Sequence, residues 1–139
     1  MKGSYILLLY LPQDSEIKTR AKIFALKRGY YAYVGSAMNS LEKRVERHFK
    51  KEKRLHWHID YLTLKTEPLT AYLIPSSVRL EEILSKEIAK IGEVVRGFGA
   101  SDLNVPGNLF YFNHDPRYLV EKLLQSLGLT YIEFRASEE

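Results

Sequence analysis

The stretch YYAYVGSAMNSLEKRVERHF, residues 30–49, changes from a strand pattern to a helix pattern partway along. Within the strand, Tyr31 and Tyr33 are expected to point to one side and the residues between them to the other, because side chains alternate. The second part carries an apolar residue at every fourth position, Leu41, Val45 and Phe49. That spacing is typical of an amphipathic helix, so the stretch predicts a strand that leads into a helix.

The predicted helix begins at a capping-box spacing, Asn39 followed by Glu42, and is expected to run for about 13 residues. Arg44 and His48 stand one turn apart at the border of the apolar stripe, where side chains can point into a cleft beside the sheet. Tyrosines of the strand could converge with them there. The alternative is that Arg44 and His48 are solvated and the tyrosines only pack.

The sequence before this stretch predicts the start of an antiparallel sheet. Residues 4–10 form a compact apolar run that reads as a buried strand, and residues 13–20 are polar and read as a connection. The runs 23–26 and 30–34 flank Lys27-Arg28-Gly29, a short polar break that predicts a hairpin.

The sequence after this stretch predicts two more helices and up to three strands. Residues 55–64 are ambiguous between helix and strand, whereas residues 69–75, 109–112 and 130–134 read as strands. One helical stripe consists of Leu80, Leu84, Ile88, Ile91 and Val95. A last helix begins at Asp115-Pro116, ends at Gly128 and faces inward through Leu119, Leu123, Leu124 and Leu127. Residues 1–139 are therefore interpreted as one α+β domain, a small, mainly antiparallel sheet flanked by helices.

Composition excludes several classes of protein. The chain has 139 residues, 45% hydrophobic and 27% charged, which is ordinary for one globular domain and argues against disorder. It has no cysteine, so disulfides, zinc ribbons and thiol nucleophiles are excluded, and any metal must use oxygen or nitrogen ligands. No apolar run is long enough to span a bilayer, so we expect no membrane partner and a cytoplasmic location.

The positive charge is concentrated in one segment. Lys and Arg outnumber Asp and Glu by 21 to 17, and residues 42–54 hold seven basic and three acidic side chains, which leaves 14 of each sign elsewhere. Such a stripe suits the phosphate backbone of a nucleic acid. The candidate contact residues are Lys43, Arg47, Lys50 and Lys51. The alternative is that the stripe only keeps the protein soluble.

Several motifs in order resemble the GIY-YIG nuclease family. They are Gly3-Ser4-Tyr5, Tyr33-Val34-Gly35-Ser36-Ala37, Glu42-Lys43-Arg44 with Arg47-His48-Phe49, and Leu80-Glu81-Glu82-Ile83-Leu84-Ser85-Lys86. The blocks His56-Trp57-His58-Ile59-Asp60-Tyr61 and Gly97-Phe98-Gly99-Ala100-Ser101-Asp102 are similar to the Uri-type branch of that family. Two features depart from it: Tyr5 and Tyr33 are 28 positions apart, and Leu103, Val105 and Asn108 replace the two cysteines and the histidine of that branch.

The resemblance implies a GIY-YIG-like fold and a DNA endonuclease that depends on Mg²⁺ or Mn²⁺. Glu81 would hold the single metal ion and Arg44 would bind the scissile phosphate. Tyr5 or Tyr33 would orient or deprotonate the attacking water. His48, with His56 or His58, would position water or move protons. A dimer or a protein partner is expected because one short stripe is a small surface for gripping a long duplex.

Several alternatives stay open at this stage. On a helical wheel Glu82 lies opposite the apolar stripe and Glu87 within it, so Glu87 competes with Glu81 for the metal. On a strand, His56, His58 and Asp60 would share one face, as in a zinc site completed by His114 and Asp115. The chain could also be a nucleic-acid-binding module without turnover, or a ribonuclease, because nothing in it reads a 2′-hydroxyl.

Overall fold

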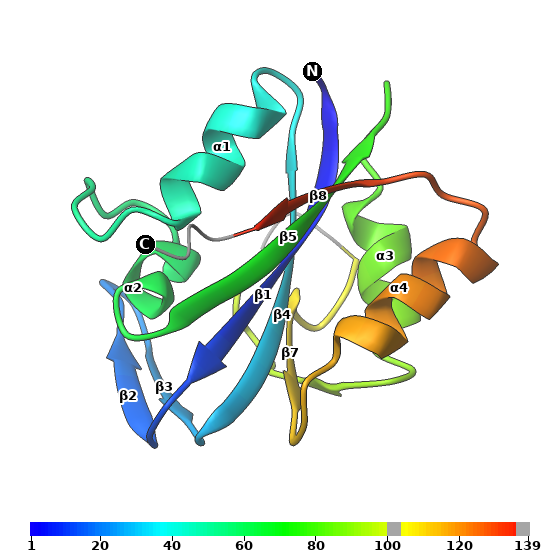
Figure 1. Ribbon diagram of the computed structural model, residues 1–139. Helices are drawn as coiled ribbons and strands as arrows, with labels where there is room; N and C mark the ends of the chain where they lie inside the picture. The colour runs from blue at the N-terminus through cyan, green and yellow to red at the C-terminus, as the bar shows by residue number, and fades with distance from the viewer. Residues whose placement is uncertain (100–103, 136–139) are drawn as a thin grey trace.

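A six-stranded antiparallel sheet forms the centre of the protein (Figure 1). The computed structural model describes residues 1–99 and 104–135. The strand order is β6-β7-β4-β1-β5-β8. The strands are β1 (Gly3–Leu11), β4 (Gly29–Ala37), β5 (Glu67–Pro75), β6 (Glu93–Val94), β7 (Leu109–Phe112) and β8 (Ile132–Arg135). The α+β class and the antiparallel sheet predicted from the sequence are confirmed.

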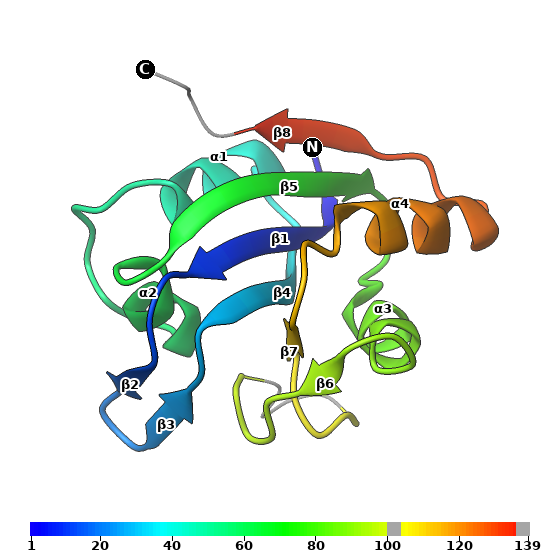
Figure 2. The ribbon, with the colours of Figure 1, turned by 60° about the horizontal axis from the view of Figure 1, so that its bottom comes forward.

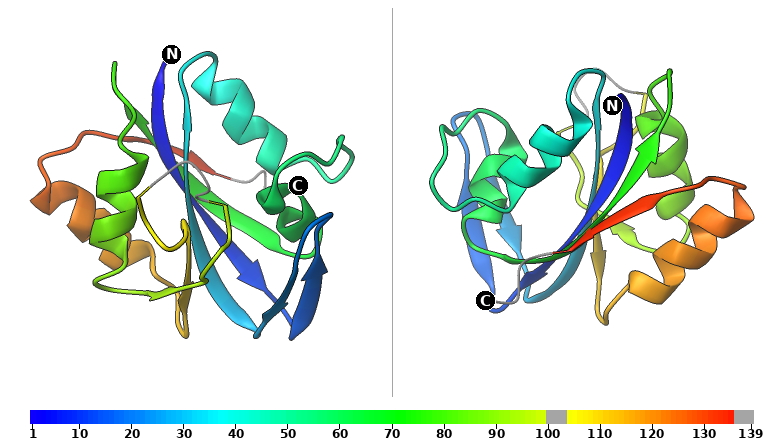
Figure 3. Two further views of the ribbon diagram at one scale, coloured as in Figure 1. Left: turned by 180° about the vertical axis from the view of Figure 1, so that it is seen from behind. Right: turned by 45° about the horizontal axis from the view of Figure 1, so that its top comes forward.

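Helices cover both faces of this sheet (Figures 2 and 3). One face carries α1 (Leu41–His48) and α2 (His58–Thr63), and the other carries α3 (Glu81–Ile88) and α4 (Arg117–Ser126). A separate two-stranded sheet, β2 (Ser15–Lys18) with β3 (Ile23–Leu26), lies beside α2. No helix among residues 1–99 and 104–135 is long and apolar enough to cross a membrane.

The central strand β1 supplies side chains to two cores, one on each face. Tyr5, Leu7 and Leu9 pack into the core under α1 and α2, and Ile6 and Leu8 pack into the core under α3 and α4. This division follows from the alternation of side chains along a strand that is covered on both faces. The prediction that Tyr31 and Tyr33 point to one side of their strand is also confirmed, because both pack into the core under α1 and α2.

The strand pairing near the N-terminus differs from the expected hairpin. Residues 23–26 and 29–37 are consecutive strands, but β3 pairs with β2 and β4 pairs with β1. The β1–β4 ladder runs from Gly3 opposite Ala37 to Leu11 opposite Gly29, which is far longer than a four-residue hairpin could be. Within the polar segment 13–20, which was expected to be a connection, Ser15–Lys18 form β2, in which Ile17 is buried.

The helix boundaries also differ from the sequence pattern. The first helix ends at His48, and no capping box forms, because Ser40 is the cap residue at φ 56° and Glu42 binds the N-terminal ammonium at 3.0 Å. The ambiguous residues 55–64 contain α2. The third helix stops at Ile88, so Ile91 and Val95 lie beyond it. In α4 the fully buried residues are Val120, which the pattern missed, and Leu124, whereas the other three predicted leucines are half-buried.

Candidate active site

One cleft of about 830 Å³ brings together residues from widely separated stretches of the chain. It opens where β1 and β4 meet the helices α1 and α2 and the first turn of α3. All six residues predicted to be catalytic or to bind metal line it: Tyr5, Tyr33, Arg44, His48, His58 and Glu81. Glu81 and Arg44 therefore face the same space, although α3 and α1 cover opposite faces of the sheet.

Tyr5 and His48 form a buried pair at the floor of the cleft. The Tyr5 hydroxyl lies 2.6 Å from Nε2 of His48, and both residues are almost fully buried. A Cβ atom at Gly35 would come within 2.5 Å of Cζ and the hydroxyl of Tyr5. The glycine of the Tyr-Val-Gly motif therefore leaves room for the Tyr5 ring to lie across β4.

Burial sets the protonation of these groups. It raises the pKa of Tyr5 well above its ordinary value, and the neighbouring Tyr33 adds to that rise while Arg44 opposes it. Burial also raises the pKa of Tyr33, and the Glu81 carboxylate raises it further. The pKa of His48 falls to about 3, first because of burial and then because of the Lys53 charge. At neutral pH the cleft therefore contains neutral phenols and a neutral His48 imidazole.

The arrangement around His48 indicates how its proton is placed. Nδ1 of His48 is buried and has no hydrogen-bond partner among the described residues. A buried N–H without an acceptor is rarer than a bare nitrogen, so we assign the proton to Nε2. Nε2 then donates to the Tyr5 oxygen, and the Tyr5 hydroxyl proton is left to point elsewhere.

Arg44 reaches the cleft from the middle of α1. Its Nη1 donates to the Ser36 carbonyl oxygen at 3.3 Å, which is a long contact, and its guanidinium lies 4.4 Å from the centroid of the Trp57 ring. No carboxylate pairs with it among the described residues. Its charge is therefore available to an anionic ligand.

Glu81 enters the cleft because the start of α3 is tied to the sheet. The Leu80 N–H donates to the Ser4 hydroxyl at 2.9 Å, and the Ser4 and Ser36 hydroxyl oxygens are 2.6 Å apart. The Glu81 side chain is 14% exposed, and its carboxylate lies 3.4 Å from Nη1 of Arg79.

The two competing glutamates do not line the cleft. Glu82 pairs with Lys86 at 3.2 Å and Glu87 pairs with Lys90 at 2.5 Å. Glu81 is therefore the one glutamate among the described residues that faces the cleft. A single carboxylate with neighbouring hydroxyls fits Mg²⁺ or Mn²⁺, which take much of their coordination from water and substrate phosphate.

The histidine block adopts a helix start, so the alternative of a strand with three ligands on one face is wrong. Asp60 is fully buried and turns away to Arg47, which it binds through both carboxylate oxygens. His58 accepts a hydrogen bond at Nδ1 from the Gly99 N–H at 3.0 Å, and His56 packs against Trp57. Within residues 1–99 and 104–135 no three His, Asp or Glu side chains are grouped as a metal site would require.

The basic segment is divided between structural and exposed positions. Arg47 pairs with Asp60, and Nζ of Lys51 donates to the carbonyl oxygens of Thr63 and Thr66 at 2.6 and 2.5 Å. These two predicted nucleic-acid contacts therefore join α1 and its following loop to α2. Lys43 and Lys50 are exposed. Only these two of the four expected residues present their charge freely.

Four cleft residues were missed by the sequence reasoning: Lys22, Trp57, Arg79 and Asn108. Lys22 comes from the β2–β3 turn, and its Nζ would lie 2.8 Å from a Cβ placed at Gly97. Arg79 could have been suspected, because it lies two residues before Glu81. Asn108 stood out only as a departure from the Uri-type branch, and Lys22 had no signal of its own, because only the tertiary structure brings it to the cleft.

Gly97 and Gly99 of the glycine block 97–102 lie at one wall of the cleft. Gly97 and Gly99 have φ of 79° and 62°, and a Cβ at Gly99 would approach Oδ1 of Asn108 to 2.3 Å. Asn108, one of the three replaced positions, lines the cleft, whereas Val105 does not. Ala100, Ser101, Asp102 and Leu103 lie outside the described residues.

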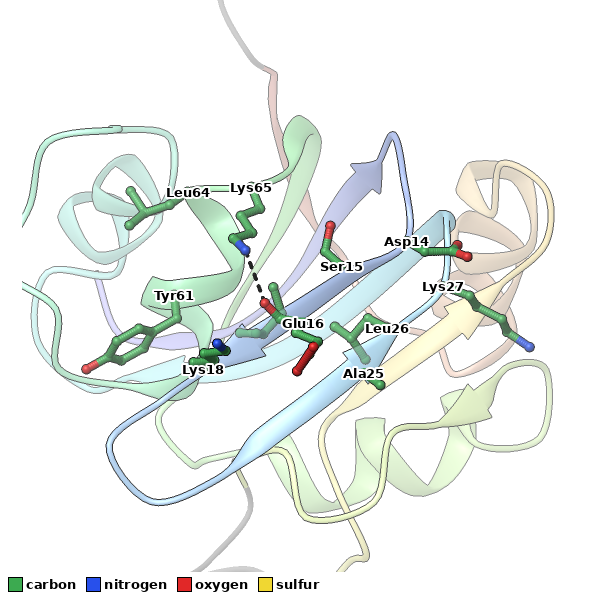
Figure 4. A pocket seen from close by; sticks show the side chains of 11 residues that line it. Asp14, Ser15, Glu16, Lys18, Ala25, Leu26, Lys27, Tyr61, Leu64 and Lys65 are labelled. Carbon is green, nitrogen blue, oxygen red and sulfur yellow. Dashed lines mark hydrogen bonds between the residues drawn. The ribbon is translucent and has the colours of Figure 1, made fainter.

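A second hollow, of about 770 Å³, lies between the β2–β3 sheet and α2 (Figure 4). Its charged side chains are of both signs, with Lys18, Lys27 and Lys65 near Asp14 and Glu16. Lys65 donates to the Glu16 carbonyl oxygen at 3.1 Å. None of the predicted catalytic residues lines this hollow, so the candidate active site is assigned to the first cleft.

Comparison with known proteins places the chain in a family without assigning an activity. Neither the curated proteins nor the solved structures contain a significant match to it. A family model does match, over residues 4–129, which includes every cleft residue discussed above. The chain therefore belongs to the family described as domain of unknown function DUF123.

Proposed function

We propose that the protein is a divalent-metal-dependent endonuclease that hydrolyses phosphodiester bonds in DNA. The observation that carries the proposal is the meeting of Tyr5, Tyr33, Arg44, His48, His58 and Glu81 in one cleft. These residues were selected from motifs that resemble the GIY-YIG nucleases, including the Uri-type branch, and they are spread over 77 positions from 5 to 81 of the sequence. Accidental packing does not account easily for such convergence.

The charge of the cleft supports a polyanionic substrate. Lys22, Arg44 and Arg79 supply three cationic side chains, and Glu81 supplies one carboxylate among the described lining residues. A cleft with this excess attracts a phosphate backbone. A divalent ion at Glu81 would add to the same attraction.

Each residue has a role that its surroundings favour. A divalent ion at Glu81 would supply Lewis-acid charge and acidify the attacking water. Arg44 binds the scissile phosphate and stabilises the negative charge that develops on it. Tyr5 and Tyr33 orient the water through their hydroxyls, because their raised pKa values keep both phenols protonated at neutral pH.

His58 is the proposed hydrogen-bond donor to the leaving oxygen, which takes its proton from solvent. Its Nδ1 accepts from the Gly99 N–H, so in the neutral ring Nε2 carries the proton. That N–H can donate a hydrogen bond to a ligand in the cleft. His48 acts by positioning, since it holds the Tyr5 hydroxyl at 2.6 Å and remains neutral.

The test is a cleavage assay with matched variants. Purified protein with Mg²⁺ or Mn²⁺ is incubated with nicked, flapped, branched and plain DNA, and with RNA of the same sequence. Glu81→Gln and Arg44→Ala are each expected to lower the cleavage rate by about 100- to 1,000-fold, because each removes charge that stabilises the transition state.

The controls change the same residue types outside the cleft. Glu82→Gln on α3 and Arg117→Ala on α4 are expected to leave the rate within about threefold of the parent. Cleavage that survives in both Glu81→Gln and Arg44→Ala would refute the proposed mechanism. Preferential cleavage of RNA would redirect the substrate assignment.

A second candidate is a nucleic-acid-binding module without turnover. It is favoured by the protonation of the buried pair, because burial raises the pKa of Tyr5 and lowers that of His48, so neither of these two groups exchanges a proton near neutral pH. This candidate predicts salt-dependent binding without cleavage under every metal condition.

A further inference from the structure

Trp57 lies at the rim of the cleft with an exposed ring that the fold does not require. Its backbone N–H donates to Oδ2 of the buried Asp60 at 2.8 Å, which fixes the start of α2. The side chain makes no capping hydrogen bond and is 37% exposed. Any residue with an N–H could cap the helix in this way, so capping does not explain an indole at this position.

Two guanidinium groups support the indole from the side of α1. Arg44 and Arg47 lie 4.4 and 4.9 Å from the ring centroid. They are three residues apart on one helix, so both contacts come from α1. Arg47 is itself held by Asp60. The ring is therefore packed on cations of α1, and Trp57 remains 37% exposed.

We propose that Trp57 stacks an unpaired nucleobase of the substrate, next to the phosphate bound by Arg44. The inference rests on the proposed function and narrows its substrate to strands that contain unpaired nucleotides. In a duplex both faces of a base are covered by its neighbours, whereas a single strand can turn a base onto an aromatic ring. The adjacent phosphate then lies close to Arg44, which is in contact with the same ring.

The predicted affinity difference is measurable. Stacking of a base on an aromatic side chain contributes about 1–3 kcal/mol, which corresponds to roughly 5- to 150-fold in affinity. A duplex is expected to bind only through the cations, so its affinity depends on salt and not on the indole.

Trp57 is the only tryptophan of the chain, so its fluorescence reports the stack directly. The probes are an oligothymidylate of about 12 nucleotides, an abasic strand of equal length, a matched duplex and an oligouridylate. EDTA prevents turnover. We expect oligothymidylate to quench the emission and the abasic strand and duplex to leave it nearly unchanged. The oligouridylate shows whether the ribose alters the stack.

Variants separate the contribution of the Trp57 ring to binding from that of the cationic side chains. Trp57→Ala is expected to weaken oligothymidylate binding, measured by anisotropy, by about 10- to 100-fold and duplex binding by less than about twofold. Trp57→Phe keeps an aromatic face and is expected to restore most of the affinity. Tyr118→Ala is the control, because Tyr118 is an exposed aromatic on α4, across the sheet from α1.

The outcomes distinguish this inference from the endonuclease proposal. Equal quenching by the abasic strand, or equal loss of duplex and single-strand affinity in Trp57→Ala, would overturn the stacking role. Base-dependent quenching without cleavage under any metal condition would support stacking and reject the endonuclease. Metal-dependent cleavage of plain duplex that is lost in Glu81→Gln would support the endonuclease. If oligothymidylate at the same time failed to quench the emission, the stacking role would be rejected. No binding at low salt would reject both.

Discussion

The two faces of the sheet differ in the chemistry of their buried side chains. The layer under α3 and α4 buries aliphatic and aromatic residues such as Ile6, Leu8 and Leu124, and its buried polar residues Ser4, Ser36 and Ser85 carry neutral hydroxyls. The layer under α1 and α2 also buries His48 and Asp60, together with the hydroxyl of Tyr5. Adjacent residues of β1 serve the two layers, so one strand joins an apolar support to a polar site.

The two layers therefore contribute to different properties of the protein. Burial of hydrocarbon stabilises the fold by roughly 25 cal/mol per Å² and asks for no particular partner. Burial of an ionisable group is unfavourable unless it is paired, so each such group in the polar layer needs a defined neighbour. We therefore expect substitutions in the apolar layer to change stability, and those in the polar layer to change chemistry or pH dependence.

The largest stability effect is expected in the apolar layer, far from the cleft. Leu124→Ala removes a fully buried side chain from α4 and leaves a cavity, which costs about 2–5 kcal/mol. Urea denaturation measures this loss. The cleavage rate of the folded fraction should stay within about twofold of the parent. A large loss of rate in folded Leu124→Ala would show that the layers are not separable.

We expect the buried His48 of the polar layer to make the free energy of unfolding depend on pH. His48 has a folded-state pKa of about 3 against an ordinary value of 6.5, so the unfolded chain takes up a proton first as pH falls. The stabilising contribution is present above pH 6.5 and is lost between pH 6.5 and 3, by about 3 kcal/mol from pH 7 to pH 4. Urea midpoints measured across this range test it.

His48→Gln supplies the comparison for this pH dependence. It removes the titrating group, so its stability should fall much less between pH 7 and 4 than that of the parent. The depressed pKa of Asp60 acts in the same direction at lower pH and is common to both proteins. Parallel curves for the two proteins would contradict the assignment of a buried neutral His48.

The smallest effects are expected at the edge of the polar layer. Lys51→Ala removes the donor to the carbonyl oxygens of Thr63 and Thr66 and should cost about 1 kcal/mol of stability. Lys50→Ala should leave stability unchanged and lower the salt slope of nucleic-acid binding by about one. Thermal unfolding and salt titrations separate the two. Equal effects of both substitutions on binding would show that Lys51 also contacts the nucleic acid.

Much of the fold was predictable because it depends on local periodicity. The alternation at Tyr31 and Tyr33 and the apolar stripe of α1 were read correctly from residues 30–49. The partners of β3 and the end of α1 were not. Both depend on competition between distant segments, since β1 takes β4 as its partner and Lys51 and Lys53 bond to backbone or side-chain oxygens of α1 and α2.

The candidate site divides in the same way. Its motif residues were found from the sequence, because their spacing places Arg44 and His48 one turn apart and resembles a known family. Trp57, Lys22 and Arg79 became cleft residues only in the folded chain, because they come from loops and helix starts whose position depends on packing. The charged stripe shows this most clearly, since its local composition is basic but Arg47 binds the Asp60 carboxylate and Lys51 binds the Thr63 carbonyl oxygen.

The sequence by itself determined most of the strands and helices, their faces and the residue types that carry the proposed chemistry, because these follow from local periodicity and side-chain chemistry. The tertiary structure alone decided which of the charges face the cleft and that Glu81 lines the same cleft as Arg44. The physical reason is that burial and pairing depend on neighbours from other segments, and only chain closure brings those neighbours together.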